Sequence, residues 1–122
     1  MESSHDSKLK DPHYGNVKEG KKIYEVRVYD ETRQKMKVSD IWIFSHNDNK
    51  DMIPIKTRIV EIKIYRTFRE AIEDTDLDVL LPGIDDVNKA IETYNKFPHK
   101  EGTYKIGAKK YGVVRFKLEL IY

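Results

Sequence analysis

The stretch from Ile53 to Tyr65 limits the choice of fold most, because it is rich in β-branched residues and changes phase midway. Odd-numbered positions carry the β-branched residues in its first half, and even-numbered positions carry them in its second half. Successive side chains of a strand point to opposite faces, so the phase change predicts a long strand with a β-bulge near Ile59–Glu61. A bulge bends its strand, as closure of a small barrel requires.

Three further segments have the pattern of strands. Even-numbered residues of Ile23–Tyr29 are apolar or aromatic and are expected in the core. In Gly112–Ile121, the even-numbered residues from Val114 to Leu120 are expected inward, whereas Arg115, Lys117 and Glu119 are expected outward. Ile41–Phe44 is a short apolar run of strand type.

Short helices are expected between the strands. Pro12–Lys18 can form a helical turn, and the capping box Thr67–Glu70 begins a helix that runs to about Asp74. A longer helix is predicted over Asp86–Phe97, with Asp85 as its N-cap and Pro98 as its stop.

The remaining segments are expected to be irregular. Asp30–Arg33 and Leu80–Gly83 are predicted as turns, His99–Lys110 as a basic flexible loop, and residues 1–7 as disordered. The whole pattern predicts one α+β domain over residues 1–122. Its expected architecture is a small β-barrel of about five to six strands with short peripheral helices.

The composition excludes several classes of protein. The chain has no cysteine, which excludes disulfide scaffolds and thiolate metal sites, and its four histidines lack the spacing of metal ligands. We therefore predict no metal and no cofactor. The first ten residues are polar, and the longest aliphatic or aromatic run spans four residues. We accordingly expect no secretory signal, no membrane partner, and a cytoplasmic or nuclear location. The oligomeric state stays open.

Charge is distributed unevenly along the chain. Its net charge is +2, but residues 71–98 carry two basic and seven acidic residues, whereas residues 99–122 carry six basic and two acidic ones. If the basic parts at the two ends of the chain meet, they form a positive surface suited to phosphates. The alternative is an ordinary solvated exterior, since 36% of the residues are charged.

The most informative string is Gly20–Arg27, which satisfies the pattern G-x-K-x-x-E-x-R. The pleat of a strand sends Glu25 and Arg27 out of the same face, and the long stem of Lys22 can swing over that face from the start of the strand. Such a cluster can grip a phosphate or a base edge, or place a lysine beside a carboxylate for proton transfer. The alternative is an ordinary salt bridge on a half-exposed strand.

The motif and its downstream context resemble the ASCH domain family, whose members share a PUA-like β-barrel. The resemblance covers Leu9 to Ile121. Beyond the motif it includes Glu25–Asp30, Arg33, Val38–Phe44, Tyr65–Ile72, Leu80–Gly83, Tyr94–Phe97 and Tyr111–Val114. One departure is Ser39, where the family usually has glycine before the aspartate; the substitution is expected to reshape one turn.

The resemblance implies a cleft that faces nucleic acid, with RNA or another single-stranded nucleic acid, or a modified nucleoside, as the partner. By position, Lys22, Glu25 and Arg27 are the cleft residues. Tyr29 shares the strand face of Glu25 and Arg27, and it is expected either to stack on a base or to pack at the rim of the cleft. Lys21 and Arg33 complete the expected set of binding residues.

A small hydrolase is the alternative, with Lys22 and Glu25 as the catalytic acid/base pair. Some relatives hydrolyse acetylcytidine nucleosides with a lysine and a threonine of the motif and a glutamate elsewhere, and others are reported to be nucleases. The activity would be that of a ribonuclease or of a modified-nucleoside amidohydrolase. Here Glu25 stands where that threonine would be, which argues against the amidohydrolase. A protein-interaction module that docks a basic partner on the acidic segment 74–86 is the third reading.

Overall fold

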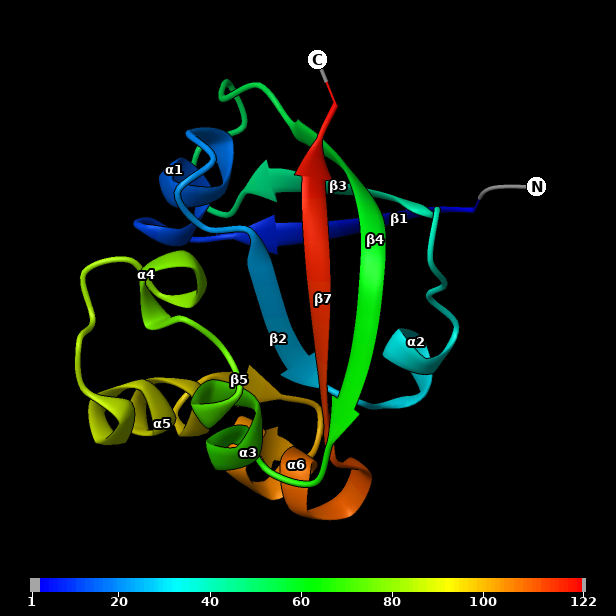
Figure 1. Cartoon of the computed structure of the whole chain (residues 1–122). Coiled ribbons are helices and arrows are strands. Elements are labelled where there is room, and N and C mark those ends of the chain that lie inside the picture. The colour runs from blue at the N-terminus through cyan, green and yellow to red at the C-terminus, as the bar shows by residue number, and fades with distance from the viewer. Residues whose placement is uncertain (1–2, 122) are drawn as a thin grey trace.

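The computed structural model describes residues 3–121, and its main element is a strongly curled sheet (Figure 1). Within this range the sheet has five strands in the order β1-β3-β4-β7-β2. Its strands are β1 (Ser4–Leu9), β2 (Tyr24–Val28), β3 (Ile41–His46), β4 (Ile55–Tyr65) and β7 (Val113–Leu120). All neighbours pair antiparallel except β1 and β3, which run parallel. The α+β, barrel-like fold predicted from the sequence is confirmed.

The curl leaves β1 and β2 as the two edges of the sheet. In Figure 1, β1 and β3 cross behind β4 and β7 at a steep angle, so the sheet forms about half of a barrel. The predicted bulge in β4 is present, because its register with β7 shifts between Ile59 and Glu61. Ile59 is fully buried at this bend. The barrel would close only if β1 and β2 paired with each other, and they do not. A seam without strand pairing therefore remains between these two edge strands.

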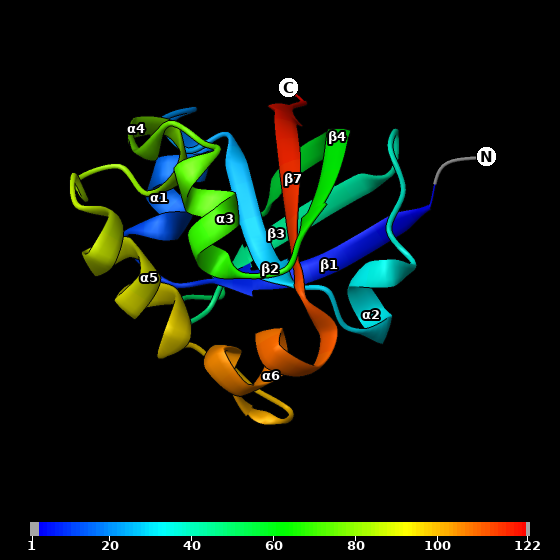
Figure 2. The ribbon, with the colours of Figure 1, turned by 60° about the horizontal axis from the view of Figure 1, so that its bottom comes forward.

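Short helices fill the connections. Those that precede β3 are α1 (His13–Lys18) and α2 (Glu31–Gln34). Between β4 and β7 lie α3 (Phe68–Glu73), α4 (Leu77–Leu80), α5 (Val87–Asn95) and α6 (Tyr104–Tyr111), with the two-stranded ribbon β5 (Pro98–His99) and β6 (Gly102–Thr103). Figure 2 shows α3 beside β2, with α5 alongside α3 on its other side. None of the helices among residues 3–121 is long and apolar enough to cross a membrane.

The sheet carries a hydrophobic core on each face. The helix-side core joins Val26 and Val28 of β2 to apolar residues of α3, α5 and α6. The aromatic core lies inside the curl and contains Trp42, Phe44 and Phe116. Adjacent residues of β7 point to opposite faces of the sheet and so belong to different cores: Val113 to the helix-side core and Val114 to the aromatic core.

Arg115 corrects the expectation for β7, because it is only 6% exposed. Its guanidinium lies 4.5 Å from the centroid of the Tyr24 ring and pairs with Glu61 at 2.9 Å. One guanidinium nitrogen also donates to the hydroxyl of Thr75, just after α3. The outward face of the strand is therefore covered by the helical insert, which strand alternation alone cannot show.

The N-terminal segment is also ordered, contrary to expectation. Residues 4–7, expected to be disordered, belong to β1, where Ser7 accepts a hydrogen bond from Nε1 of Trp42 at 2.9 Å. The same prediction also covers residues 1 and 2, which lie outside the described range. Parallel pairing with β3 fixes this strand, and a polar sequence gives little sign of such a partner.

Two segments expected to be irregular are helical. Asp30 caps α2 by accepting a hydrogen bond from the backbone N–H of Arg33, so Asp30–Arg33 is more than a turn. His99–Lys110, predicted as a flexible loop, instead forms the β5–β6 ribbon and most of α6. Although α6 carries several lysines, its residues Gly107 and Ala108 are buried.

Other boundaries differ in detail. Thr67 caps α3 as predicted, whereas α5 is capped by Asp86 and not by Asp85. Ser39 has a φ of +80°, the left-handed conformation for which glycine is best suited.

We expect Gly107→Ala to destabilise the protein by about 1–3 kcal/mol, because a Cβ there would lie 2.9 Å from Nδ1 of His99. The ring cannot easily move, since Nε2 of His99 pairs with Asp30 at 2.8 Å and Nδ1 accepts the backbone N–H of Glu101. Chemical denaturation measures the effect. At an unconstrained helix position the same change would stabilise by roughly 1 kcal/mol.

Lys109→Ala, at an exposed position of the same helix, is the matched control, with an expected change within about 0.5 kcal/mol. Adding His99→Ala to Gly107→Ala removes the clash, so the two effects should not add. A Gly107→Ala protein as stable as the wild type would contradict the fixed position of the His99 ring.

Candidate functional site

A cavity of about 210 Å³ lies at the seam between the two edge strands. Leu9 at the end of β1 and Val26 in β2 both line it. Further lining residues come from α1, α5 and α6 and from the segments after β3 and α4. The open side of the half-barrel is thus where separate elements meet around a hollow.

The three motif residues come together in this cavity. The carboxylate of Glu25 lies between two cations: Oε2 pairs with Nη2 of Arg27 at 2.8 Å, and Oε1 lies 3.5 Å from Nζ of Lys22. Lys22 also donates a hydrogen bond to the backbone carbonyl of Leu80, at the end of α4. The cluster holds two positive charges and one negative charge, so it leaves an excess of one positive charge at the cavity wall.

The charges that surround Glu25 keep its carboxyl group ionised. Burial opposes ionisation of the carboxyl, but the positive charges of Arg27 and Lys22 and the hydrogen bond from Arg27 lower the pKa of Glu25 to about 2. Burial lowers the pKa of Lys22 below its ordinary value, although Glu25 acts in the opposite direction. For Arg27, burial lowers the pKa, but the charge of Glu25 and the hydrogen bond to its carboxylate outweigh burial, and the pKa is raised.

Lys22 is more buried than the sequence suggested. The sequence predicts that its long stem reaches over the strand face from the start of the strand, but the side chain is only 1% exposed. The side chain of Arg27 is 14% exposed and keeps more contact with the cavity. Arg27 is therefore the motif cation best placed to touch a ligand, while Lys22 holds the carboxylate and the end of α4 in position.

Arg33 lies close to the motif without lining the cavity. Its guanidinium stands 5.2 Å from the centroid of the Trp42 ring, and that of Arg27 stands 5.5 Å from the same ring. Burial, followed by the charge of Arg27, lowers the pKa of Arg33. Trp42 is fully buried beneath these cations.

The other two predicted binding residues are not among the residues that line the cavity. Lys21 is exposed and pairs with Glu19 at 2.9 Å. Tyr29 packs against the aromatic core, one residue beyond the end of β2. The strand motif thus places three of the six predicted side chains in the cavity wall.

Several lining residues were not predicted from the sequence. Lys8 and Lys10 are exposed beside the cavity, and Phe97 and Tyr104 give it aromatic walls. His13, to which the sequence assigned no role, meets the Phe97 ring edge-on at 5.8 Å. Burial and the charge of Lys22 lower the pKa of His13, which favours a neutral imidazole. These residues are scattered over the chain, and only the fold brings them together.

Tyr94 of α5 also lines the cavity. Its ring stacks on Phe68 at 5.2 Å. Within residues 3–121 its hydroxyl has no hydrogen-bond partner, and no group of three or more acidic or histidine side chains is placed to hold a metal ion.

Comparison with known proteins supports the relationship suggested by the motif. A family model described as the ASCH domain matches residues 8–121. The crystal structure of the hypothetical protein PH0355 is 30% identical, with a TM-score of 0.80, and the match covers 97% of this chain and 99% of that one. The NMR structure of protein PF0455 from Pyrococcus furiosus is 31% identical, with a TM-score of 0.70 and coverages of 99% and 98%. A search of curated proteins found no significant match.

The lowered pKa of Glu25 predicts an acid-sensitive contribution to stability. Its folded-state pKa of about 2 lies below the ordinary value of 4.5, so the contribution is fully present above about pH 4.5 and is lost as the pH falls toward 2. Between pH 5 and 2, wild type should lose on the order of 3 kcal/mol more stability than Glu25→Gln. Denaturant unfolding across this pH range measures the difference.

Glu92→Gln is the control, because it removes an exposed carboxylate that pairs with Lys96 at 2.9 Å and should leave the pH profile unchanged. At pH 7, Glu25→Gln should cost about 3–5 kcal/mol, since two buried cations lose their partner. If that variant does not fold, an NMR titration of the Glu25 carboxyl carbon in wild type gives the pKa directly. A value near 4.5 would contradict the electrostatic account.

Proposed function

The chain belongs to the ASCH domain family, and from this premise we propose that its cavity binds single-stranded RNA through Lys22, Glu25 and Arg27. The observation that supports the proposal most directly is the convergence of these three side chains in one cavity wall. A guanidinium fixed by a carboxylate is well suited to a phosphate or to an acceptor on a base edge.

The charge around the cavity favours a polyanionic ligand. The motif leaves one excess positive charge, and the exposed side chains of Lys8 and Lys10 add two more beside the cavity. An excess of positive charge beside a hollow concentrates anionic ligands there and speeds their association. The two lysines would contact the phosphate backbone, and the motif would contact the nucleotide that enters.

The size and walls of the cavity favour an unpaired nucleotide over a duplex. A volume of about 210 Å³ suits one planar ring, and Phe97 and Tyr104 supply aromatic surface. Unstacked bases of single strands are commonly recognised by aromatic side chains together with hydrogen bonds to their edges. In a duplex those edges are paired and the base faces are stacked.

Hydrolysis is the second candidate, because Lys22 combines a lowered pKa with a neighbouring carboxylate. Glu25, with a pKa of about 2, is a weak proton acceptor near neutral pH, which favours binding over acid–base chemistry. Incubation with RNA and with acetylated cytidine distinguishes the two functions. Turnover that disappears in a folded Lys22→Met variant would establish the enzyme, whereas no turnover in wild type favours binding alone.

We expect a Lys8→Ala/Lys10→Ala variant to bind a single-stranded RNA oligonucleotide about tenfold more weakly than wild type at low salt. The slope of log K against log salt should become shallower by about 1.4, since each lost phosphate contact on a single strand removes about 0.7. Fluorescence anisotropy at several salt concentrations measures both values.

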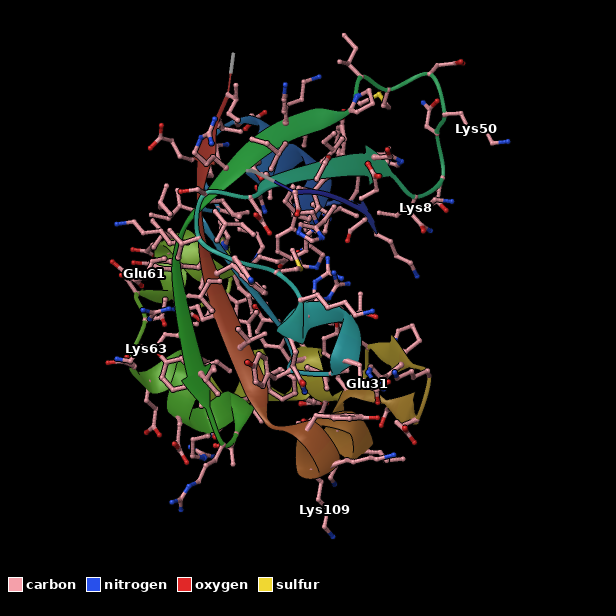
Figure 3. All side chains as sticks on the ribbon, turned by 90° about the vertical axis from the view of Figure 1, so that its right-hand side faces the viewer. Lys8, Glu31, Lys50, Glu61, Lys63 and Lys109 are labelled. Carbon is pink, nitrogen blue, oxygen red and sulfur yellow. The ribbon has the colours of Figure 1, made fainter. Side chains whose placement is uncertain are left out.

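Lys109→Ala is the matched control, because Lys109 is an exposed lysine that Figure 3 shows toward the opposite end of the molecule from Lys8. Its affinity and salt slope should stay close to those of wild type. Failure of wild type to bind any RNA at low salt, or an equal loss in the control, would argue against an RNA site at this cavity.

A further inference from the structure

We propose that His13 binds a phosphate of the ligand at the cavity and takes up a proton as it does so. This inference rests on the proposed function, since it adds a binding residue to the same site and makes binding depend on pH. It draws on three observations: His13 lines the cavity without a hydrogen bond, its charged neighbours there are mostly cations, and the other histidines of the chain are already paired with aspartates.

His13 differs from the other three histidines, which each hold an aspartate. In those pairs Nε2 lies 2.8 or 2.9 Å from a carboxylate oxygen: His5 with Asp40, His46 with Asp11, and His99 with Asp30. Within residues 3–121 the ring of His13 forms no hydrogen bond or ion pair, although it meets the Phe97 ring edge-on. The residue is only partly buried, and neither ring nitrogen is enclosed by protein. A ligand in the cavity can therefore reach these nitrogens.

The cavity wall offers His13 no carboxylate of its own. Glu25 is the one acidic residue that lines the cavity among residues 3–121, and both of its oxygens already face cations. Burial and the charge of Lys22 lower the pKa of His13, the charge of Glu25 acts in the opposite direction, and the charge of Arg27 lowers the pKa again. The imidazole is therefore neutral near neutral pH, and a negative charge that stabilises its protonated form must come from a ligand.

The other titratable groups around His13 do not change this balance toward an internal ion pair. Those that also line the cavity are two lysines and two tyrosines: Lys8, Lys10, Tyr94 and Tyr104. On β3, beside α1, the ring of His46 meets Tyr14 edge-on at 5.0 Å and is held by Asp11. The acidic residue nearest to His13 in the sequence is thus already occupied by another histidine.

A phosphate at this position would supply the missing negative charge. The protonated imidazole has two N–H donors, and hydrogen bonds between charged groups are stronger than those between neutral ones. A nearby opposite charge raises the pKa of a histidine, so binding of the phosphate transfers a proton from the solvent to His13. A phosphodiester stays ionised over the pH range in which histidine titrates, and the proton therefore remains on the protein.

The chain also places His13 close to the two exposed lysines that are proposed to hold the phosphate backbone. His13 is the first residue of α1, and the backbone N–H of Tyr14 donates to the carbonyl of Lys10 at 3.0 Å, which closes a turn between them. Lys8 precedes this turn on β1. An RNA strand that follows the lysines would thus bring a phosphate to the imidazole.

An NMR titration of the His13 Cε1–H signal from pH 8 to pH 5 tests the proposal in wild type. It is recorded for the free protein and for the protein saturated with a single-stranded oligouridine at low salt. Uridine suits the test because its base neither gains nor loses a proton in this range. RNA should raise the midpoint for His13 by about one pH unit, the lower end of the effect of a close opposite charge. An unchanged midpoint at saturation would overturn the role of His13.

Affinity provides the second readout, by fluorescence anisotropy with the same oligouridine. Wild type should bind about tenfold more tightly at pH 5.5 than at pH 7.5, because uptake of about half a proton, averaged over two pH units, changes the affinity tenfold. His13→Gln keeps a polar side chain but cannot take up the proton. Its affinity should be the same at both pH values and within about twofold of the wild-type affinity at pH 7.5.

His5→Gln is the matched control, because it removes an imidazole of β1 that pairs with Asp40 and does not line the cavity. It should keep the pH dependence of wild type. A pH dependence that persists in His13→Gln, or that disappears equally in His5→Gln, overturns the role of His13 and leaves RNA binding standing. If either variant does not fold, the NMR titration of wild type decides alone. Wild type that binds oligouridine at neither pH overturns both proposals.

Discussion

Glu25 is an ionised carboxylate held inside the protein between Lys22 and Arg27, and much of the surrounding structure serves to keep it there. Removing three charges from water is costly unless each finds close partners. The carbonyl of Leu80 at the end of α4 accepts from Lys22, and the Trp42 ring of β3 lies beneath Arg27. The cluster therefore depends on a helix and a strand far from it in the sequence, and loss of either contact would leave a buried cation poorly compensated.

The half-barrel explains why this cluster borders a cavity. Because β1 and β2 are the edges of the curled sheet, their facing sides are not filled by strand pairing, and residues of both strands line the hollow. The insert between β4 and β7 closes one side with the aromatic residues Tyr94, Phe97 and Tyr104. The same helices that cover the sheet with the helix-side core thus provide the stacking surface and the unpartnered hydroxyl beside the charged wall.

The parts of this fold that follow local rules could be predicted from the sequence. Alternation in β2 and β7, the bulge near Ile59 and the Thr67 cap each depend on neighbours within a few residues. The strand at Ser4–Leu9 and the burial of Arg115 could not be predicted, because each depends on a partner distant in sequence. The same holds at the site: the pleat placed Glu25 and Arg27 together, whereas the depth of Lys22 arises only from packing.

An NMR titration with a short single-stranded RNA at low salt, following the side-chain Nε–H signal of Arg27, tests the central claim most directly. If the charged cavity is the binding site, this signal and the backbone signals of β2 and α5 should shift together, saturate, and return toward their free positions when salt is added. Shifts confined to exposed lysines elsewhere, with Arg27 unchanged at saturation, would show that RNA binds outside the cavity and would contradict the account.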